Sequence, residues 1–232
     1  EYEITKKTIT LTAGQFTAEQ LRLTPAYTSP GWVAGDFHIH SQPSTDSGLP
    51  IEDRVISCAA EGLEVAVATD HNYITDYAPA IAASGLDPWL LGIPGMELTT
   101  FEMGHFNGYP LKIDPGSTRG GEFVWANQPP QKLFDQLRSL AVDPAKGIVQ
   151  VNHPRQQVLG YFASFFIDPA TAEPYTPAGI LGVFAPYGDE FQPDKFSYDF
   201  DAIELLTGKK TENIHDFVAP SPLPPGPFPD PQ

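Results

Sequence analysis

The placement of the histidines limits the fold of this chain more than any other feature of its sequence. Five of the six stand in short motifs, and His38 and His40 form an H-x-H pair at the end of the strand-like segment 33–40. Neighbouring side chains on a strand point to opposite faces, so these two rings point the same way while Phe37 and Ile39 point the other way. The pattern predicts a strand with one packed face and one face able to bind a metal ion.

Apolar runs alternate with helical patterns from Gly35 onward, which is typical of β/α units around a parallel sheet or barrel. Strands are expected at 65–69, 90–94, 147–152 and 201–206. Helices are expected at 50–61, which has a proline near its start and Gly62 beyond its end, and at 130–140. Because α/β barrels keep their active sites at the carboxyl ends of the strands, we expect a barrel with polar side chains at one end.

The polar residues that follow these strands have the chemistry of metal ligands. Imidazoles with a few carboxylates suit Zn, Mn or Fe, whereas an all-oxygen set would suggest Mg or Ca. One tetrahedral ion with an open position typically takes three protein ligands, so a larger set implies two or three divalent ions, with Glu97 as the expected bridge. The expected ligands are His38, His40, Asp46, His71, Glu97, His105 and His153.

The motifs around these residues are similar to those of the PHP (polymerase and histidinol phosphatase) superfamily. They read G-D-F-H-I-H-S (35–41), A-T-D-H-N (68–72), G-M-E (95–97), G-H-F (104–106) and V-N-H-P-R (151–155). The G-H-F-N and N-H-P-R stretches and the later D-A-I-E-L-L-T-G resemble the carbaryl-hydrolase-like branch of that superfamily. The resemblance covers roughly residues 33–210. It implies a distorted (β/α)7 barrel with a di- or trinuclear metal site.

One departure from the family concerns the end of the chain. PHP sites usually close with an Asp-x-His motif near the C-terminus, and this sequence has none. The only late histidine, His215, precedes Asp216 in the wrong order and spacing, so we do not expect it to bind metal. A truncated chain, ligands from another segment, or a site with fewer ions would each account for the departure.

Several acidic residues have more than one interpretation. Asp46 either binds metal, since the family often has His or Asp at this spacing from the H-x-H pair, or caps the helix that starts near Pro50. Asp70 either orients a histidine, which is the preferred interpretation, or caps a loop. Glu102 is an alternative to Glu97, and Glu204 either faces the site or forms a structural salt bridge.

The expected function is that of a metal-dependent hydrolase, preferably a phosphoesterase that uses a metal-activated hydroxide. Arg155 is expected to hold a phosphate or carboxylate oxygen, and with Asp70 it completes the expected catalytic residues. The alternatives are a carbamate, amide or ester hydrolase on the same site, or a non-catalytic metal-binding module. With 13 Lys and Arg in all, a low-charge or diester substrate fits better than a monoester.

Composition limits the classes of binding partner and the cellular compartment that we expect for this protein. A formal net charge of −16 argues against nucleic-acid backbone binding, and no apolar run approaches the ~20 residues of a membrane helix. Cys58 is expected to be a buried helix residue. We expect an N-terminal β extension (1–30), a PHP-like domain (31–218) and an extended or disordered Pro-rich tail (219–232), with a possible further domain beyond it. The missing initiator methionine, scarce lysine and Pro-rich tail favour a secreted or periplasmic protein over a cytoplasmic one.

Overall fold

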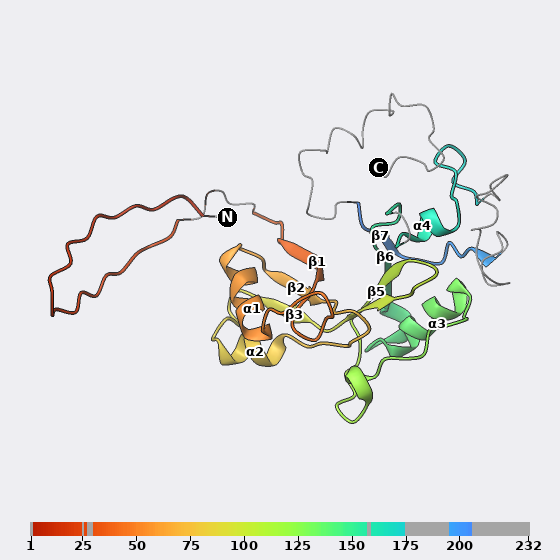
Figure 1. Ribbon diagram of the computed structural model, residues 1–232, viewed down its shortest axis with the longest axis horizontal. Helices are drawn as coiled ribbons and strands as arrows, with labels where there is room; N and C mark the ends of the chain where they lie inside the picture. The colour runs from red at the N-terminus through yellow and green to blue at the C-terminus, as the bar shows by residue number, and fades with distance from the viewer. Residues whose placement is uncertain (1, 25, 27–29, 157–158, 175–194, 206–232) are drawn as a thin grey trace.

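A computed structural model describes residues 2–24, 26, 30–156, 159–174 and 195–205, which fold into two small sheets with helices packed against them (Figure 1). The first sheet and its helices contain β1 (Gly35–Ile39), α1 (Ile51–Ala60), β2 (Val65–Ala68), α2 (Ala78–Ala83) and β3 (Leu91–Ile93). The second part contains β4 (Met96–Thr99), β5 (His105–Tyr109), η1 (Thr118–Gly120), α3 (Pro130–Leu140), η2 (Pro144–Lys146), β6 (Ile148–Val151), α4 (Tyr161–Ser164) and β7 (Ala202–Ile203).

The first sheet is parallel, in the order β1-β2-β3. Its middle strand, β2, is the run that the sequence marks as apolar on both faces, and Ala66, Val67 and Ala68 are fully buried. α1 and α2 pack on this sheet, and Val55 and Cys58 of α1 are buried, as expected for Cys58. The carboxyl ends of β1 and β2 therefore lie together at one edge of this sheet.

The second sheet, in the order β4-β5-β6-β7, has one apolar and one polar face. Its pairs are antiparallel, antiparallel and parallel. On one face Leu98, Phe106 and Val151 stand in register and pack in a core with residues of α3 and α4. On the other face Glu97, Asn107 and Gln150 stand in register. This alternation follows from the period of two residues in a strand, and it reserves the polar face for a site.

The two sheets meet where the chain passes from β3 to β4. The amide of Glu97 donates to the carbonyl of Asp70 at 3.1 Å, and the amide of Asn72 donates to the carbonyl of Glu97 at 2.8 Å. Gly95 lies at the junction, where an added Cβ would stand 2.8 Å from the carbonyl oxygens of Ala68 and Gly108. Only glycine allows this close approach, which brings the carboxyl end of β2 beside β4.

The predicted (β/α)7 barrel is wrong, because the described strands form two open sheets rather than one closed barrel. The decisive connection is the one between β4 and β5, which spans only residues 100–104 and joins antiparallel neighbours. A crossover between parallel strands needs a dozen or more residues, so this loop cannot hold the helix of a β/α unit. Neither β4 nor β5 was predicted as a strand, and the antiparallel pairing that they form was not predicted either.

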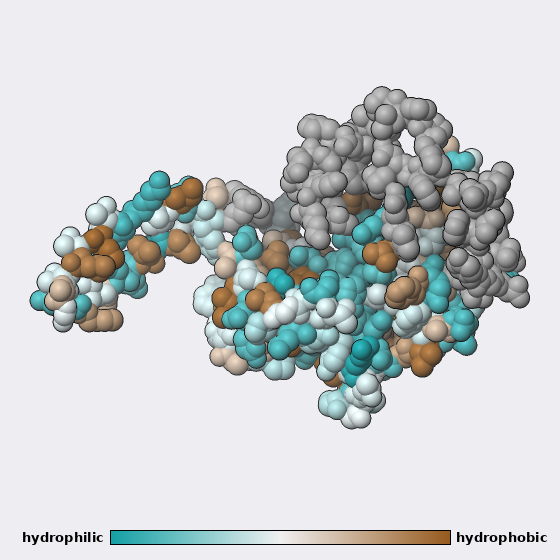
Figure 2. Space-filling model, viewed as in Figure 1, coloured by the Kyte–Doolittle hydropathy of each residue, from teal (hydrophilic) through white to brown (hydrophobic). Residues whose placement is uncertain are grey.

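The predicted helices at 50–61 and 130–140 are confirmed as α1 and α3, and strands lie within each of the five segments where they were predicted. The predicted N-terminal β extension is wrong: residues 3–24 contain no helix or strand. They run out from the rest of the molecule and back (Figure 1), and Figure 2 shows apolar side chains on the surface of this arm. Ile4 and Phe16 are among its exposed apolar residues. Alternation alone does not form a strand where no neighbouring strand or core accepts the apolar face. The Pro-rich tail lies outside the described residues.

Candidate metal centre

Five histidines form a closed ring at the junction of the two sheets. Neighbouring ring centroids are 5.0 Å apart for His38 and His40, 4.4 Å for His40 and His71, and 5.5 Å for His71 and His105. The circle closes through His153, whose centroid is 4.9 Å from that of His105 and 5.9 Å from that of His38. The structure therefore brings together every histidine that the sequence predicts as a ligand.

The elements position these rings as the strand pattern predicts. His38 and His40 flank the buried Ile39 at the end of β1, and His71 lies just beyond β2. His105 is the first residue of β5. His153 follows β6 by two residues and has a φ of 26°, a left-handed conformation that is uncommon outside glycine. Backbone strain of this kind concentrates at functional sites, where the surrounding structure holds it.

Glu97 lies at the centre of the ring and is fully buried. Its Oε1 atom is 3.2 Å from His38 Nε2, 3.1 Å from His105 Nδ1 and 3.5 Å from His153 Nε2. Its Oε2 atom is 3.1 Å from His40 Nε2 and 2.8 Å from His71 Nδ1. Burial alone would raise the pKa of Glu97, but its contacts with the histidines outweigh burial and hold this pKa well below its usual range. The centre of the ring is therefore an ionised carboxylate.

The spacing of these atoms fits ligands that share a metal ion. Two ligand atoms about 2.1 Å from one tetrahedral ion lie about 3.4 Å apart, and about 3.0 Å apart around an octahedral ion. The nitrogen-to-oxygen distances around Glu97 run from 2.8 to 3.5 Å, which covers both values. Three overlapping groups have ligand atoms within 4.8 Å of one another, and these are His38–His40–Glu97, His40–Asp46–His71 and His71–Glu97–His105.

Unsatisfied atoms at the ring are a second, independent sign of a cation. Within the described part of the chain, His105 Nε2 and His153 Nδ1 are buried without a hydrogen-bond partner, and Glu97 Oε2, although close to two rings, makes no hydrogen bond of suitable geometry. A buried polar atom left without a partner costs about 1–3 kcal/mol, and more when it is charged. A divalent ion would compensate Glu97 and use lone pairs that the protein does not satisfy. The residues present therefore fit metal ions.

The protonation of the rings differs around the circle. Burial lowers the pKa of His38, but contacts with Glu204 and Glu97 outweigh it and raise this pKa to about 10. The pKa of His40 is also raised, since contacts with Glu97 and Asp46 outweigh burial. Burial keeps the pKa of His105 below its ordinary value despite the nearby Glu97. Protons and metal ions therefore compete for the same nitrogens.

Asp46 lies at the more exposed side of the ring. Its Oδ1 atom is 2.9 Å from His40 Nδ1, and its Oδ2 atom is 3.5 Å from His71 Nε2. Some burial raises the pKa of Asp46, but contacts with His40 and Ser44 outweigh it and lower this pKa to about 2. Pro50 is the N-cap of α1 and no side chain caps it, so the structure favours the metal-binding interpretation of Asp46 over helix capping.

Asp70 is fully buried and supports the backbone rather than a ring. Its carboxylate accepts hydrogen bonds from the amide and hydroxyl of Ser41, at 2.5 and 2.9 Å, and from the hydroxyl of Thr75 at 2.5 Å. Among the described residues no hydrogen bond joins Asp70 to a histidine ring. Asp70 therefore fixes the turn that follows His40, which fits the loop-capping alternative rather than the expected contact with a histidine.

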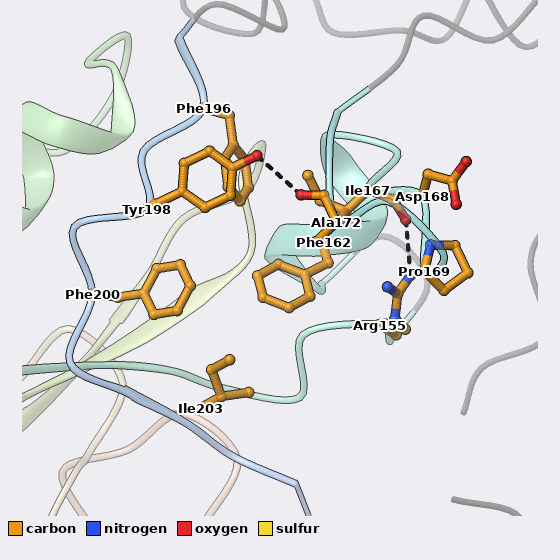
Figure 3. Close-up of a pocket in the computed structure, with 10 residues that line it drawn as sticks. All are labelled: Arg155, Phe162, Ile167, Asp168, Pro169, Ala172, Phe196, Tyr198, Phe200 and Ile203. Carbon is orange, nitrogen blue, oxygen red and sulfur yellow. Dashed lines mark hydrogen bonds between the residues drawn. The ribbon is translucent and has the colours of Figure 1, made fainter.

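Arg155 lines a cavity of about 220 Å³ (Figure 3). Its Nη1 donates to the carbonyl of Ile167 at 3.0 Å, and its guanidinium carbon lies 5.8 Å from the centre of the Phe162 ring. Ile203, which also lines the cavity, pairs with Val151 and so lies on the apolar face of the second sheet. The cavity therefore lies on the apolar face of the second sheet, opposite the face that carries the histidines, and Arg155 makes its described contacts there.

Two residues of the site were missed or left open by sequence reasoning. Asn152 is fully buried and donates to Glu97 Oε1 at 2.9 Å, and Glu204 lies 3.2 Å from His38 Nδ1. The available signal for Asn152 was a polar residue at the end of an apolar run, directly before a histidine. Glu97 rather than Glu102 occupies the centre of the ring, and His215 lies outside the described residues.

Comparison with known proteins does not add a family to these observations, because no protein-family model and no curated protein matches the sequence. The described part of the chain also contains no helix that is both long enough and apolar enough to cross a membrane. The structure itself therefore carries the functional argument.

Proposed function

We propose that this protein is a metal-dependent hydrolase of the PHP type, with a site related to that of the carbaryl-hydrolase-like branch. The observation that carries the proposal is the closed ring of five histidines around the buried carboxylate of Glu97. In a purely structural site, protein ligands fill every coordination position of one ion. This ring has more donor atoms than one tetrahedral ion can bind. We propose two or three Zn, Mn or Fe ions, which Glu97, the five histidines and Asp46 would hold.

Bound divalent ions would supply a Lewis acid and a water molecule activated near neutral pH. The residues of the chain then have separate tasks. Glu97, held ionised by its neighbours, compensates the positive charge at the centre of the ring. With metal bound, the histidines would supply neutral nitrogen donors from both sheets, and Asp46 would supply an oxygen donor on the exposed side, where its side chain is 56% exposed. A substrate would therefore approach from the side of Asp46.

The preferred substrate class is a phosphoester of low charge, such as a diester. The formal net charge of −16 disfavours a substrate with several negative charges. Arg155, the cation predicted to hold phosphate, makes its described contacts at the far face of the second sheet. These two observations keep an uncharged ester, amide or carbamate as the second candidate substrate for the same site.

The test combines metal analysis with turnover. Purified protein is analysed by inductively coupled plasma mass spectrometry, and hydrolysis of bis-p-nitrophenyl phosphate and p-nitrophenyl acetate is followed before and after chelation. Two or three ions per chain with chelator-sensitive turnover of the diester would support the proposal. Turnover of the acetate alone would select the second candidate, and less than one ion without turnover would indicate a non-catalytic module.

A pair of variants tests the centre of the site. Glu97→Gln removes the charge to which all five rings point, so we expect loss of bound metal and of turnover. Glu102→Gln is the matched control, since Glu102 belongs to none of the described metal-binding groups. Equal metal content in both variants would refute the assignment of Glu97.

A further inference from the structure

The side chain of Glu204 lies behind His38, on the side away from Glu97. His38 Nε2 is 3.2 Å from Glu97 Oε1, and His38 Nδ1 is 3.2 Å from Glu204 Oε1. The two nitrogens of an imidazole point in divergent directions, so they cannot bind the same ion. Glu204 also belongs to none of the described groups of three possible ligands. Its position is therefore that of a residue that supports a ligand.

This contact fixes which nitrogen of His38 carries a proton. An ionised carboxylate only accepts hydrogen bonds, so Nδ1 must carry the hydrogen that it donates to Glu204. In a neutral ring the lone pair then lies on Nε2, which faces the centre of the site. A carboxylate behind a metal-bound histidine is a general way to set the tautomer and orientation of the ring.

The second oxygen of the same carboxylate supports a second histidine. Glu204 Oε2 accepts the backbone amide of His153 at 2.8 Å. This residue has the φ of 26° that a side chain other than glycine rarely adopts, and such a conformation persists only where neighbouring contacts hold it. The result is a ring whose Nε2 lies 3.5 Å from Glu97 Oε1. One carboxylate therefore contacts two expected ligands from different strands.

The backbone holds Glu204 firmly in this place. Its amide donates to the carbonyl of Val151 at 2.8 Å, which continues the parallel pairing of β7 with β6. Ile203 and Glu204 point to opposite faces, and Figure 3 shows Ile203 at the cavity. Glu204 is thereby directed to the polar face, where its side chain is 12% exposed.

We propose that Glu204 is a positioning residue that selects the tautomer of His38 and holds the backbone of His153 for metal binding. The inference rests on the proposed metal centre and adds to it a residue outside the ligand set. Loss of such a supporting carboxylate typically weakens metal affinity 10- to 100-fold.

The experiment measures zinc affinity and ring tautomers in the full chain. Affinity is measured by competition with a chromophoric chelator, and the histidine rings are assigned by long-range ¹H–¹⁵N NMR of the zinc-loaded protein. Glu204→Leu removes both contacts, so we expect a 10- to 100-fold loss of zinc affinity and loss of the single Nδ1–H form of His38. Glu204→Gln has one carbonyl oxygen and can satisfy only one of the two donors, so its affinity should be intermediate.

Glu64→Gln is the matched control. Glu64 lies before the start of β2, at the end of the sheet away from the histidines, and accepts the backbone amide of Ala34 at 3.0 Å. Its substitution should leave zinc affinity unchanged. Thermal unfolding of each variant with chelator present shows whether the fold is kept. If Glu204→Leu does not fold, Glu204→Gln decides the question by the same two measurements.

The outcomes separate this inference from the proposed function. Failure of the unmodified protein to bind zinc would overturn the metal centre and this role with it. Tight zinc binding by the unmodified protein, with the same affinity and the same His38 tautomer in the Glu204 variants, would overturn the role of Glu204 alone. Reduced affinity with a changed tautomer in a folded variant would support it.

Discussion

Asn152 connects the centre of the site to the polar face of the second sheet, and its replacement should be unusually costly for a single amide. The side chain is fully buried. Its Nδ2 donates to Glu97 Oε1 at 2.9 Å and to Asn107 Oδ1 at 2.7 Å, and its Oδ1 accepts from Gln150 at 3.1 Å. Asn152→Ala would remove all three hydrogen bonds, so each of the three buried partners would lose one.

The expected cost follows from these three contacts. A hydrogen bond to a charged group contributes about 2 kcal/mol, and a neutral one about 1 kcal/mol. One contact with the ionised Glu97 and two with neutral amides therefore give a loss of about 4 kcal/mol. With a urea dependence of about 2 kcal/mol per molar, the midpoint of unfolding should fall by about 2 M.

Urea unfolding should be followed with chelator present, so that changes in metal binding do not enter the measured stability. Gln15→Ala removes an exposed amide in the N-terminal segment and is expected to change the free energy of unfolding by less than about 0.5 kcal/mol. Asn107→Ala and the double variant complete a cycle, and contact between the two residues predicts that their effects are not additive. If the free energy of unfolding of Asn152→Ala lies within about 1 kcal/mol of that of the unmodified protein, the reasoning from buried contacts is refuted.

Three further predictions test other links between the fold and the site. Arg138 donates to the side chains of Asp199 and Asp201, at 2.9 and 3.0 Å. Arg138→Met should therefore destabilise the fold by about 1–3 kcal/mol and weaken zinc binding through β7, which directly precedes Glu204, whereas Lys146→Met should change neither in the same assays. In chelator-treated protein, the lowered pKa of Asp46 contributes stability that is present above its ordinary value of 3.8 and is lost as the pH falls towards about 2. Acid titration followed by circular dichroism should therefore show a smaller loss of stability in this pH range for Asp46→Asn than for the unmodified protein. Addition of zinc at about 1,000 times its dissociation constant should raise the free energy of unfolding by about 4 kcal/mol, and an unchanged thermal midpoint would contradict a native metal site.

The local pattern of the sequence predicted which side chains lie together better than it predicted the fold. The H-x-H pair depends only on the period of a strand, and the structure places both rings on the same side as expected. The order and direction of the strands depend on which segments pair, and short apolar runs carry little information about that. The five-residue connection between β4 and β5 was the available sign that these strands are antiparallel.

The support around the ligands was harder to predict because it depends on distant pairing. Glu204 reaches His38 across 166 positions, through the parallel pairing of β7 with β6. The alternation with Ile203 shows that the two side chains point to opposite faces of the sheet, but not which face Glu204 takes. Only the register of β7 against β6 decides this. The contacts of Asp70 with Ser41 and Thr75 likewise follow from the arrangement of loops rather than from strand period.

The polar face of the second sheet supports the proposal that the site binds a cation. Burying Glu97, Asn107 and Gln150 side by side is costly unless each polar atom finds a partner. The protein meets most of this need itself: Tyr109 donates to Gln150 at 2.9 Å, and Asn107 donates to the carbonyl of Phe37 at 2.8 Å. The amides thus have partners within the sheet and across to β1. In the described part of the chain, Oε2 of Glu97, Nε2 of His105 and Nδ1 of His153 remain without a hydrogen bond, and divalent ions bound at the ring would compensate the charge of Glu97.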